Sequence, residues 1–416
     1  MLYSFHELQR TLLRPLAETA AATATWLQHQ DLLPARLARA NLALLHRMIK
    51  PYGKPAFAID RVMAHGREVV VTEDLVVATS FCRLVRFVRT SDDAATQASL
   101  AAAPRVLVCA PLSGHHPTLV RDTVATLLQD HDVYITDWID AREVPVDRGV
   151  FHLDDYVTLI QRFLRTLGPT SLHVVSVCQP TVPVLAAVAL MAAAGEPTPR
   201  SLTLMGGPLD ARKSPTVVNK LATDHPIGWF ESNMIHRVPG NHAGRGRAVY
   251  PGFLQLTAFV MMNPTRHAES YQAYWFDQLR GEAGEPAVRA HEKFYDEYNA
   301  VLDMDAAYYL DTVRVVFQEF ALARGTWDVG GQRVEPAAIT QTALFTIEGA
   351  EDDISGLGQT EAAHAMCANV PAGMRRRLVA EGCGHYGLFS GSKWREQIYP
   401  ELRSFIAAQQ TSGSSA

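Results

Sequence analysis

The sequence predicts an α/β fold built on a mostly parallel, doubly wound sheet. Six short apolar segments rich in β-branched residues recur along the chain, and helix-like stretches such as 118–128 and 154–167 separate the first four. The six strand candidates are Arg105–Ala110, Asp132–Thr136, Ser171–Val177, Ser201–Gly206, Thr342–Glu348 and Arg377–Glu381. Strand–helix alternation of this kind is typical of parallel βαβ units whose strands are covered on both faces.

The start of the chain predicts additional elements before this series. Residues 1–50 carry Leu and Ala at helical spacing and predict one or two helices. Two further strand candidates, Arg67–Thr72 and Leu75–Phe81, predict an antiparallel beginning of the sheet. We therefore assign residues 1–211 to the N-terminal helices and the first part of the core.

The alternation of strands and helices stops between residues 212 and 340. This segment is rich in aromatic residues, which predicts a helical cap inserted over the carboxyl edge of the sheet. Residues 341–408 then complete the core. The last segment, 409–416, is rich in Ser, Gly and Ala and predicts a disordered tail.

Composition limits the classes of function. Of 416 residues, 48% are hydrophobic and 19% are charged, which indicates a large buried core. The net charge of −5 provides no basic surface for nucleic acid or for an anionic membrane. No secretion signal opens the chain, and the longest apolar run, residues 182–194, is shorter than the roughly 20 residues of a membrane-spanning helix. Five cysteines without metal-type spacing favour a reduced, cytoplasmic location.

Cys178 lies at the junction of a predicted strand, Ser171–Val177, and a predicted buried helix within 182–194. A reactive side chain between a buried strand and a buried helix is the layout of a nucleophile elbow. The usual elbow reads G-x-S-x-G. Here sulfur replaces oxygen, and Ser176 and Pro180 occupy the two glycine positions.

Two later strand ends carry suitable partners for this thiol. The strand Thr342–Glu348 leads to Asp352 and Asp353, and the last strand leads to His385. Nucleophile, acid and histidine then follow in the order of the α/β-hydrolases, and the sequence predicts that fold with a catalytic triad. We favour Asp352 over Asp353 as the acid, because the acid of that fold commonly precedes an apolar loop residue by two positions.

An oxyanion hole is expected beside the elbow. One donor is the backbone N–H of Gln179, and the second lies in the loop after the first parallel strand. Ser113 is the first choice for that donor, with Leu112 and Gly114 as alternatives. The adjacent pair at 115–116, both histidines, lacks a recognisable third ligand, so neither a metal nor another cofactor is predicted.

Each of these features also has a purely structural interpretation. A single cysteine among apolar residues is most often a core residue, and a single pair of aspartates is most often a solvated turn. Only their combination at matching strand ends favours catalysis. The aromatic residues of the cap are mainly core residues by default, but a minority are available to meet substrate or partner. Because an apolar cap surface is able to meet a second copy of the chain, a homodimer is one of the alternatives for the oligomeric state.

With these motifs in place, the chain resembles the intracellular polyhydroxybutyrate (polyhydroxyalkanoate) depolymerases. The resemblance spans nearly the whole chain and is carried by residues 111–117, 134–142, 173–191, 352–356 and 384–387. It implies a cytoplasmic α/β-hydrolase-type enzyme that acts on granules of short-chain storage polyester. The family's catalytic cysteine, aspartate and histidine correspond to Cys178, Asp352 and His385, and the Cys178-Gln179-Pro180 elbow is specific to it.

The resemblance implies cleavage of poly(3-hydroxybutyrate) through a thioester on Cys178. Three alternatives remain open. A polyester synthase or related acyltransferase also uses a cysteine on this fold, although synthases usually keep a glycine-bounded elbow. The second alternative is a depolymerase that transfers the acyl group to coenzyme A in place of water. The third is a granule-coating protein that keeps the fold without catalysis. Side-chain preference and endo or exo cleavage stay open too.

Overall fold

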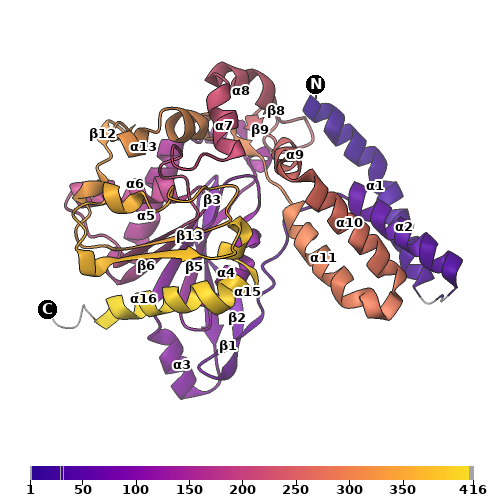
Figure 1. Ribbon diagram of the computed structural model, residues 1–416, viewed down its shortest axis with the longest axis horizontal. Helices are drawn as coiled ribbons and strands as arrows, with labels where there is room; N and C mark the ends of the chain where they lie inside the picture. The colour runs from indigo at the N-terminus through magenta and orange to yellow at the C-terminus, as the bar shows by residue number, and fades with distance from the viewer. Residues whose placement is uncertain (1, 29, 31, 412–416) are drawn as a thin grey trace.

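A central sheet of nine strands organises the computed structural model, which describes residues 2–28, 30 and 32–411 (Figure 1). The strand order across the sheet is β1-β2-β3-β5-β4-β6-β7-β13-β14. The strands are β1 Arg61–Ala64, β2 Arg67–Ala78, β3 Cys82–Thr90, β4 Arg105–Cys109, β5 Asp132–Trp138, β6 Leu172–Val177, β7 Ser201–Met205, β13 Ala343–Gly349 and β14 Arg375–Ala380.

The pairing of neighbouring strands changes once across this sheet, from antiparallel to parallel. Strands β1, β2 and β3 pair in antiparallel fashion, and β3 joins β5 in the same way. From β5 to β14 every neighbouring pair is parallel. In register, Val177 pairs with Met205 and Met205 pairs with Ile347, so the carboxyl ends of β6, β7 and β13 reach the same edge. Functional side chains that follow these strands are therefore neighbours.

Helices cover both faces of the sheet. On one face, α5 (Leu153–Leu167) and α6 (Thr181–Ala193) pack against the strands. On the other, α4 (Arg121–Leu127) and α16 (Tyr399–Thr411) do so. Two large apolar clusters fill these two interfaces. Helix α6 is buried on nearly all sides, as its run of Ala, Val and Leu predicts.

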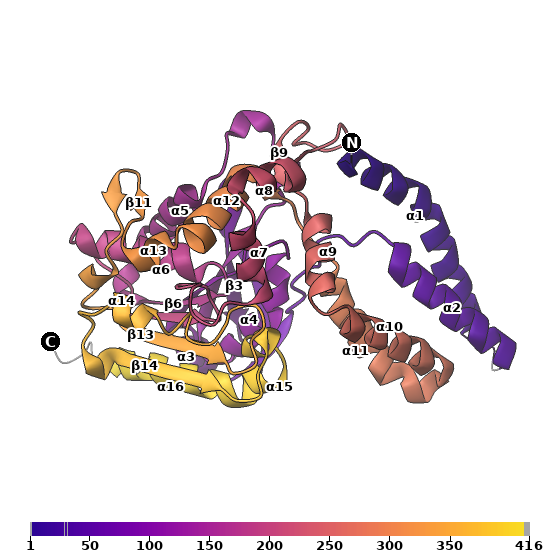
Figure 2. The same cartoon turned by 45° about the horizontal axis from the view of Figure 1, so that its top comes forward.

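The chain leaves the sheet after β7 and returns at β13. The inserted segment contains α7 Val217–Asp224, α8 Ile227–Met234, α9 Gly252–Met262, α10 Pro264–Leu279, α11 Glu285–Tyr298, α12 Ala306–Asp311 and α13 Ala321–Arg324. It also contains the short strands β8 His236–Arg237, β9 Ala248–Tyr250, β10 Met304–Asp305, β11 Asp328–Val329 and β12 Gln332–Arg333. Helices α7, α8 and α12 lie over the sheet, and α10 and α11 extend away from it (Figures 1 and 2). The exact domain boundaries, near 211 and 340, stay predictions.

The N-terminal residues form two helices, α1 (Leu2–Leu27) and α2 (Leu33–Ile49), that lie beside the inserted segment (Figures 1 and 2). Helix α2 packs against α10, and Arg47 and Lys50 both form ion pairs with Asp296 of α11. The remaining helices are α3 Ala94–Ala101, α14 Ala363–Met366 and α15 Gly391–Lys393. None of the helices in the described ranges is long and apolar enough to cross a membrane.

The antiparallel part of the sheet differs from the prediction. The candidate Arg67–Thr72 and the first four residues of Leu75–Phe81 form one continuous strand, β2, which ends at Ala78. An irregularity in pairing between Leu75 and Val77 does not break this strand. Strands β1 and β3 were not expected. In β3, arginines at 83, 86 and 89 interrupt the apolar pattern and hide the strand from a search for apolar runs.

The predicted disordered tail is wrong for its first three residues, because α16 continues to Thr411. The end of this helix is held by hydrogen bonds. Arg200 donates to the carbonyl oxygens of Gln409 and Gln410, and the Gln410 side chain bonds to His173 of β6. Residues 412–416 lie outside the described residues.

Candidate active site

Cys178 occupies a sharp turn between β6 and α6. Its φ angle is 67°, in the left-handed region that residues other than glycine seldom adopt. The turn is fixed by two backbone bonds: Cys178 donates its N–H to the Met205 carbonyl at 2.7 Å, and Thr181 donates to the Cys178 carbonyl at 3.1 Å. Strain of this kind persists where the surroundings hold it, and it is a property of nucleophile elbows.

The elbow lacks its usual glycines, and two glycines on the neighbouring strand end supply the space. A Cβ atom on Gly207 would lie 1.8 Å from Thr181 Oγ1 and 2.6 Å from the Cys178 carbonyl oxygen. Gly206 has a φ of 54°, and its Cβ would lie 3.4 Å from both Asp352 Oδ2 and His385 Cε1. Sequence analysis missed this pair, although two adjacent glycines directly after a predicted strand are a visible signal.

We expect Gly207→Ala to lose most ester hydrolysis and about 1–3 kcal/mol of unfolding free energy, because the new methyl group overlaps backbone atoms of the elbow. Chemical denaturation and activity measured on the same sample check this. Gly373→Ala is the matched control, since nothing lies within 4 Å of its Cβ. Equal behaviour of the two variants would contradict the packing described for the elbow.

His385 and Asp352 are paired next to Cys178. The distance from His385 Nδ1 to Asp352 Oδ2 is 2.7 Å, and both side chains are almost fully buried. The other oxygen of Asp352 accepts the backbone N–H groups of Ile354 and Ser355 at 2.9 and 2.8 Å. The other side of the imidazole interacts with the Cys178 side chain. The structure thus joins the three predicted residues, with Asp352 rather than Asp353 against the histidine.

The charge state of His385 follows from its surroundings. Burial acts to lower the pKa of His385, but its interactions with Cys178 and Asp352, including the hydrogen bond to Asp352, raise this pKa well above 6.5. A cysteine beside a histidine that is itself held by a carboxylate is the arrangement of an activated nucleophile.

This raised pKa makes stability depend on pH. A histidine whose pKa is higher in the folded state contributes stability that is fully present below about pH 6.5 and is lost as the pH rises through the folded value. We expect His385→Gln to destabilise the protein more at pH 6 than at alkaline pH. Urea denaturation at several pH values measures the difference. The exposed His65, replaced by Asn, is the control, and an equal pH slope in both variants would contradict the charge state.

Two residues hold the loop that carries Asp352. The buried carboxylate of Glu348 accepts backbone N–H groups from Gly358, Thr360 and Glu361 at 2.7–3.1 Å. The Thr360 hydroxyl accepts the N–H of Gly207 and donates to the Gly207 carbonyl. These bonds tie the acid loop to the strand end beside the elbow. Glu348 was noticed only as a strand end in the sequence, because its partners lie in a loop without regular pattern.

A cavity of about 410 Å³ opens onto Cys178 and His385. Its walls are mostly apolar and come from the sheet edge and from α7, α8, α9 and α12. Among the aromatic residues predicted in the cap, Phe230, Tyr308 and Tyr309 line it. Val217 and Met261 also line it and are 68% and 67% exposed, so part of its rim is apolar and accessible.

The predicted oxyanion residues lie at this cavity. Gln179, Ser113 and Leu112 all contribute to its lining. Gly114 does not line the cavity, and its φ is 100°. A Cβ atom on Gly114 would lie 2.3 Å from Cδ of Gln255, so glycine leaves room for that side chain. The choice of Gln179 and Ser113 as donors stays a prediction.

The two histidines of the same loop are both buried, and His115 also lines the cavity. His115 Nε2 bonds to the Tyr298 carbonyl at 3.1 Å, and its ring stacks on Phe259. Burial lowers the pKa of His115 to about 4 and that of His116 to about 3. Within the described part of the chain, no group of three or more His, Cys, Asp or Glu side chains is placed to hold a metal ion.

These features define the class of the protein. A mostly parallel sheet with helices on both faces, an elbow after a central strand, and an acid and a histidine after two later strands is the α/β-hydrolase fold. Residues 206–410 match the family described as "PHB de-polymerase C-terminus". This match, which covers α7 to α16 and includes Asp352 and His385, supports an ester-bond hydrolase.

Solved structures show weaker likenesses. A 2-hydroxy-6-oxo-6-phenylhexa-2,4-dienoate hydrolase from Rhodococcus sp. strain RHA1 is 11% identical over 82% of this chain and 99% of its own, with a TM-score of 0.44. A hydrolase from Pseudomonas aeruginosa PA01 is 12% identical over 80% and 98%, with a TM-score of 0.42. None of the curated proteins compared matches the sequence. The fold assignment rests on the sheet order and the elbow.

Proposed function

We propose that this protein is an intracellular depolymerase that cleaves the ester bonds of poly(3-hydroxybutyrate) through a thioester on Cys178. The observation that supports it most is His385, which bonds to Asp352, interacts with Cys178 and lines the same apolar cavity as that cysteine. The match of residues 206–410 to the polyhydroxybutyrate depolymerase family points to the polyester as substrate.

The reaction proceeds in two halves. The Cys178 thiolate attacks the ester carbonyl carbon, and the backbone N–H groups of Gln179 and Ser113 stabilise the oxyanion. Collapse of the tetrahedral intermediate breaks the C–O bond, and His385 gives its proton to the departing alkoxide. Water then attacks the thioester, with His385 taking a proton from it, and the acid is released with the thiol restored. Asp352 holds the imidazole in orientation and supports its positive charge.

The cavity fits a short-chain polyester better than a charged substrate. Its lining is mainly aliphatic and aromatic, and of the three triad residues Cys178 and His385 line it. Ester carbonyls need only a few hydrogen-bond donors, and a methyl-branched chain buries well against Tyr308 and Phe230. The apolar rim at Val217 and Met261 meets a polymer strand that enters from a solid particle.

Water as the acceptor means that no cofactor is required. The partners that follow from the proposal are the polyester chain and the surface of a storage granule, and the location is the cytoplasm beside such granules. A homodimer is compatible with this arrangement and is not needed for the triad, since Cys178, Asp352 and His385 come from one chain.

Product analysis tests the proposal against its rivals. Amorphous poly(3-hydroxybutyrate) particles are incubated with the protein, with and without coenzyme A, and soluble products are identified by mass spectrometry. We expect free 3-hydroxybutyrate or its oligomers in both samples. Products that form only with coenzyme A would indicate thiolysis, and polymer formed from 3-hydroxybutyryl-CoA would indicate a synthase. A granule protein without catalysis would release nothing.

A further inference from the structure

An apolar ridge runs along the outer side of α1. It consists of Leu2, Phe5, Leu8, Leu12 and Leu16, which are between 46% and 69% exposed. Spacings of three and four residues place all five side chains on one side of a helix. From Leu2 to Leu16 the ridge is about 21 Å long. Figures 1 and 2 show α1 at the edge of the molecule, with α2 between it and α10.

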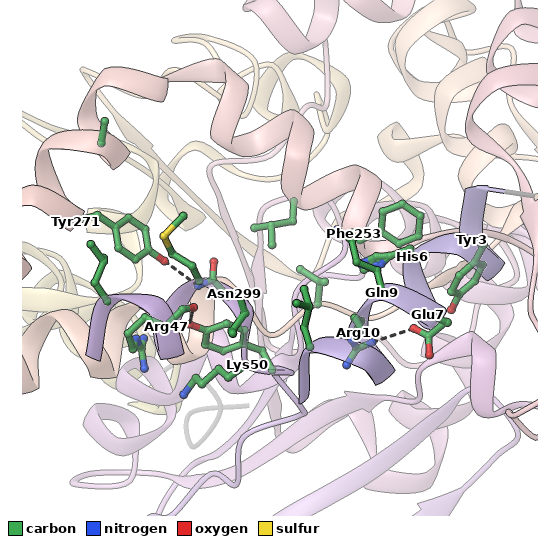
Figure 3. A pocket seen from close by; sticks show the side chains of 18 of the residues that line it. Tyr3, His6, Glu7, Gln9, Arg10, Arg47, Lys50, Phe253, Tyr271 and Asn299 are labelled. Carbon is green, nitrogen blue, oxygen red and sulfur yellow. Dashed lines mark hydrogen bonds and ion pairs between the residues drawn. The ribbon is translucent and has the colours of Figure 1, made fainter. Parts of the chain in front are cut away.

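The opposite side of α1 fixes the direction of the ridge. The Tyr3 hydroxyl donates to the buried carboxylate of Asp303, and the His6 ring stacks on Phe253 with centroids 4.0 Å apart. Farther along, His46 of α2 bonds to the Ala17 carbonyl. In Figure 3, Tyr3 and His6 lie on the side of α1 that faces Phe253, where a cavity of about 1040 Å³ separates the helices. The ridge therefore points away from the body of the protein.

This arrangement reverses the pattern of an ordinary surface helix. Such a helix turns its large apolar side chains toward the core and its polar ones toward water. In α1 the buried positions are Tyr3, Ala17 and Ala20, whereas the leucines of the ridge face outward. A contiguous exposed apolar stripe of this kind marks a surface that meets another apolar phase.

The charged residues of α1 indicate what kind of apolar surface the ridge binds. The helix carries two acidic and two basic residues, and they form the pairs Glu7–Arg10 at 3.0 Å and Arg14–Glu18 at 2.9 Å. Helices that bind anionic lipid carry a surplus of Lys and Arg on the flanks of the apolar face. Because α1 is electrically balanced, it complements a neutral apolar surface, and a polyester has no charge along its chain.

The size of the ridge argues against a second copy of this chain as its occupant. Stable protein interfaces use about 20–30 residues on each side. Five side chains on one helix offer much less. A helix lying on an extended apolar phase needs only shallow insertion, about 5–10 Å, of a single stripe.

We propose that the apolar ridge of α1 docks the protein on the neutral surface of solid polyester particles. This inference rests on the proposed function, since it names the surface through which the same enzyme reaches its insoluble substrate. Docking by α1 leaves the Cys178 cavity free, because no ridge residue lines that cavity. It also raises the concentration of enzyme at the particle without altering the chemistry.

The test is co-sedimentation of the full chain with amorphous poly(3-hydroxybutyrate) particles. The variant Phe5→Gln, Leu8→Gln, Leu12→Gln keeps helix-forming residues while removing the ridge. We expect its bound fraction to fall about tenfold or more. Hydrolysis of soluble p-nitrophenyl butyrate should stay within about twofold of wild type, since the triad is untouched.

The matched control replaces three residues of similar exposure elsewhere, Leu75, Val146 and Val150, by Gln. It should bind particles like wild type. Four results would each overturn the inference. The ridge variant could bind particles as well as wild type, or the control variant could lose as much binding as the ridge variant. Wild type could bind anionic phospholipid vesicles more strongly than polyester, or wild type could be a dimer and the ridge variant a monomer that still binds particles. Ridge-dependent binding without any ester cleavage would instead refute the proposed function and leave the docking surface standing.

Discussion

Replacing Cys178 by alanine is expected to lower kcat for a soluble 3-hydroxybutyrate ester by at least about 10⁴-fold, because no other group then forms the acyl intermediate. The cavity, His385 and Asp352 remain in place in this variant, so binding of substrate should change little. Initial rates measured over a range of substrate concentrations separate kcat from KM.

Cys367→Ala is the control for this loss. Cys367 is a free cysteine like Cys178, but it is fully buried at the end of α14 and does not line the Cys178 cavity. We expect its kcat to stay within about twofold of wild type. Retained activity in Cys178→Ala would show that another nucleophile or a direct attack by water carries the reaction, and the thioester mechanism would be wrong.

Asp352→Asn is expected to reduce kcat by roughly 10³–10⁴-fold, in the range seen when the acid of a triad is neutralised. The amide keeps the shape of the side chain but removes the charge that raises the pKa of His385. The imidazole of His385 is then no longer held in orientation, and no carboxylate stabilises its protonated form. Steady-state rates at neutral pH, together with the pH profile of kcat/KM, measure both effects.

The neighbouring carboxylate provides the control for this prediction. Asp353→Asn changes the same charge one residue away, but Asp352 is the residue bonded to His385 at 2.7 Å. We expect Asp353→Asn to retain most of its activity. A larger loss in Asp353→Asn than in Asp352→Asn would show that Asp353 is the catalytic acid and that the assignment to Asp352 is wrong.

Much of the site is predictable because each of its parts follows a recognisable strand. Strands covered on both faces are continuous apolar runs, so β6, β7 and β13 are easily located, and parallel strands bring their carboxyl ends to one edge. Cys178 directly follows β6, Asp352 lies in the turn after β13, and His385 lies in the loop after the edge strand β14. Their proximity follows from topology and needs no knowledge of side-chain packing.

The parts that sequence reasoning missed depend on contacts between distant segments. Gly207 is required only because Thr181 and the Cys178 carbonyl lie against it, and Glu348 matters because three N–H groups of a later loop point at it. Strand β3 was missed because arginines at three positions interrupt its apolar pattern. The ridge of α1 has a regular apolar spacing in the sequence, but only the structure shows that it faces outward.

The central claim is that this protein breaks ester bonds of poly(3-hydroxybutyrate) at Cys178. Its most direct test is the amount of soluble 3-hydroxybutyrate, as monomer and oligomers, released from amorphous particles by wild type and by Cys178→Ala in parallel. Wild type should release soluble product steadily without added coenzyme A, and Cys178→Ala should release none above background. Equal release by the two proteins, or none by a folded wild type that hydrolyses soluble esters, would contradict the account.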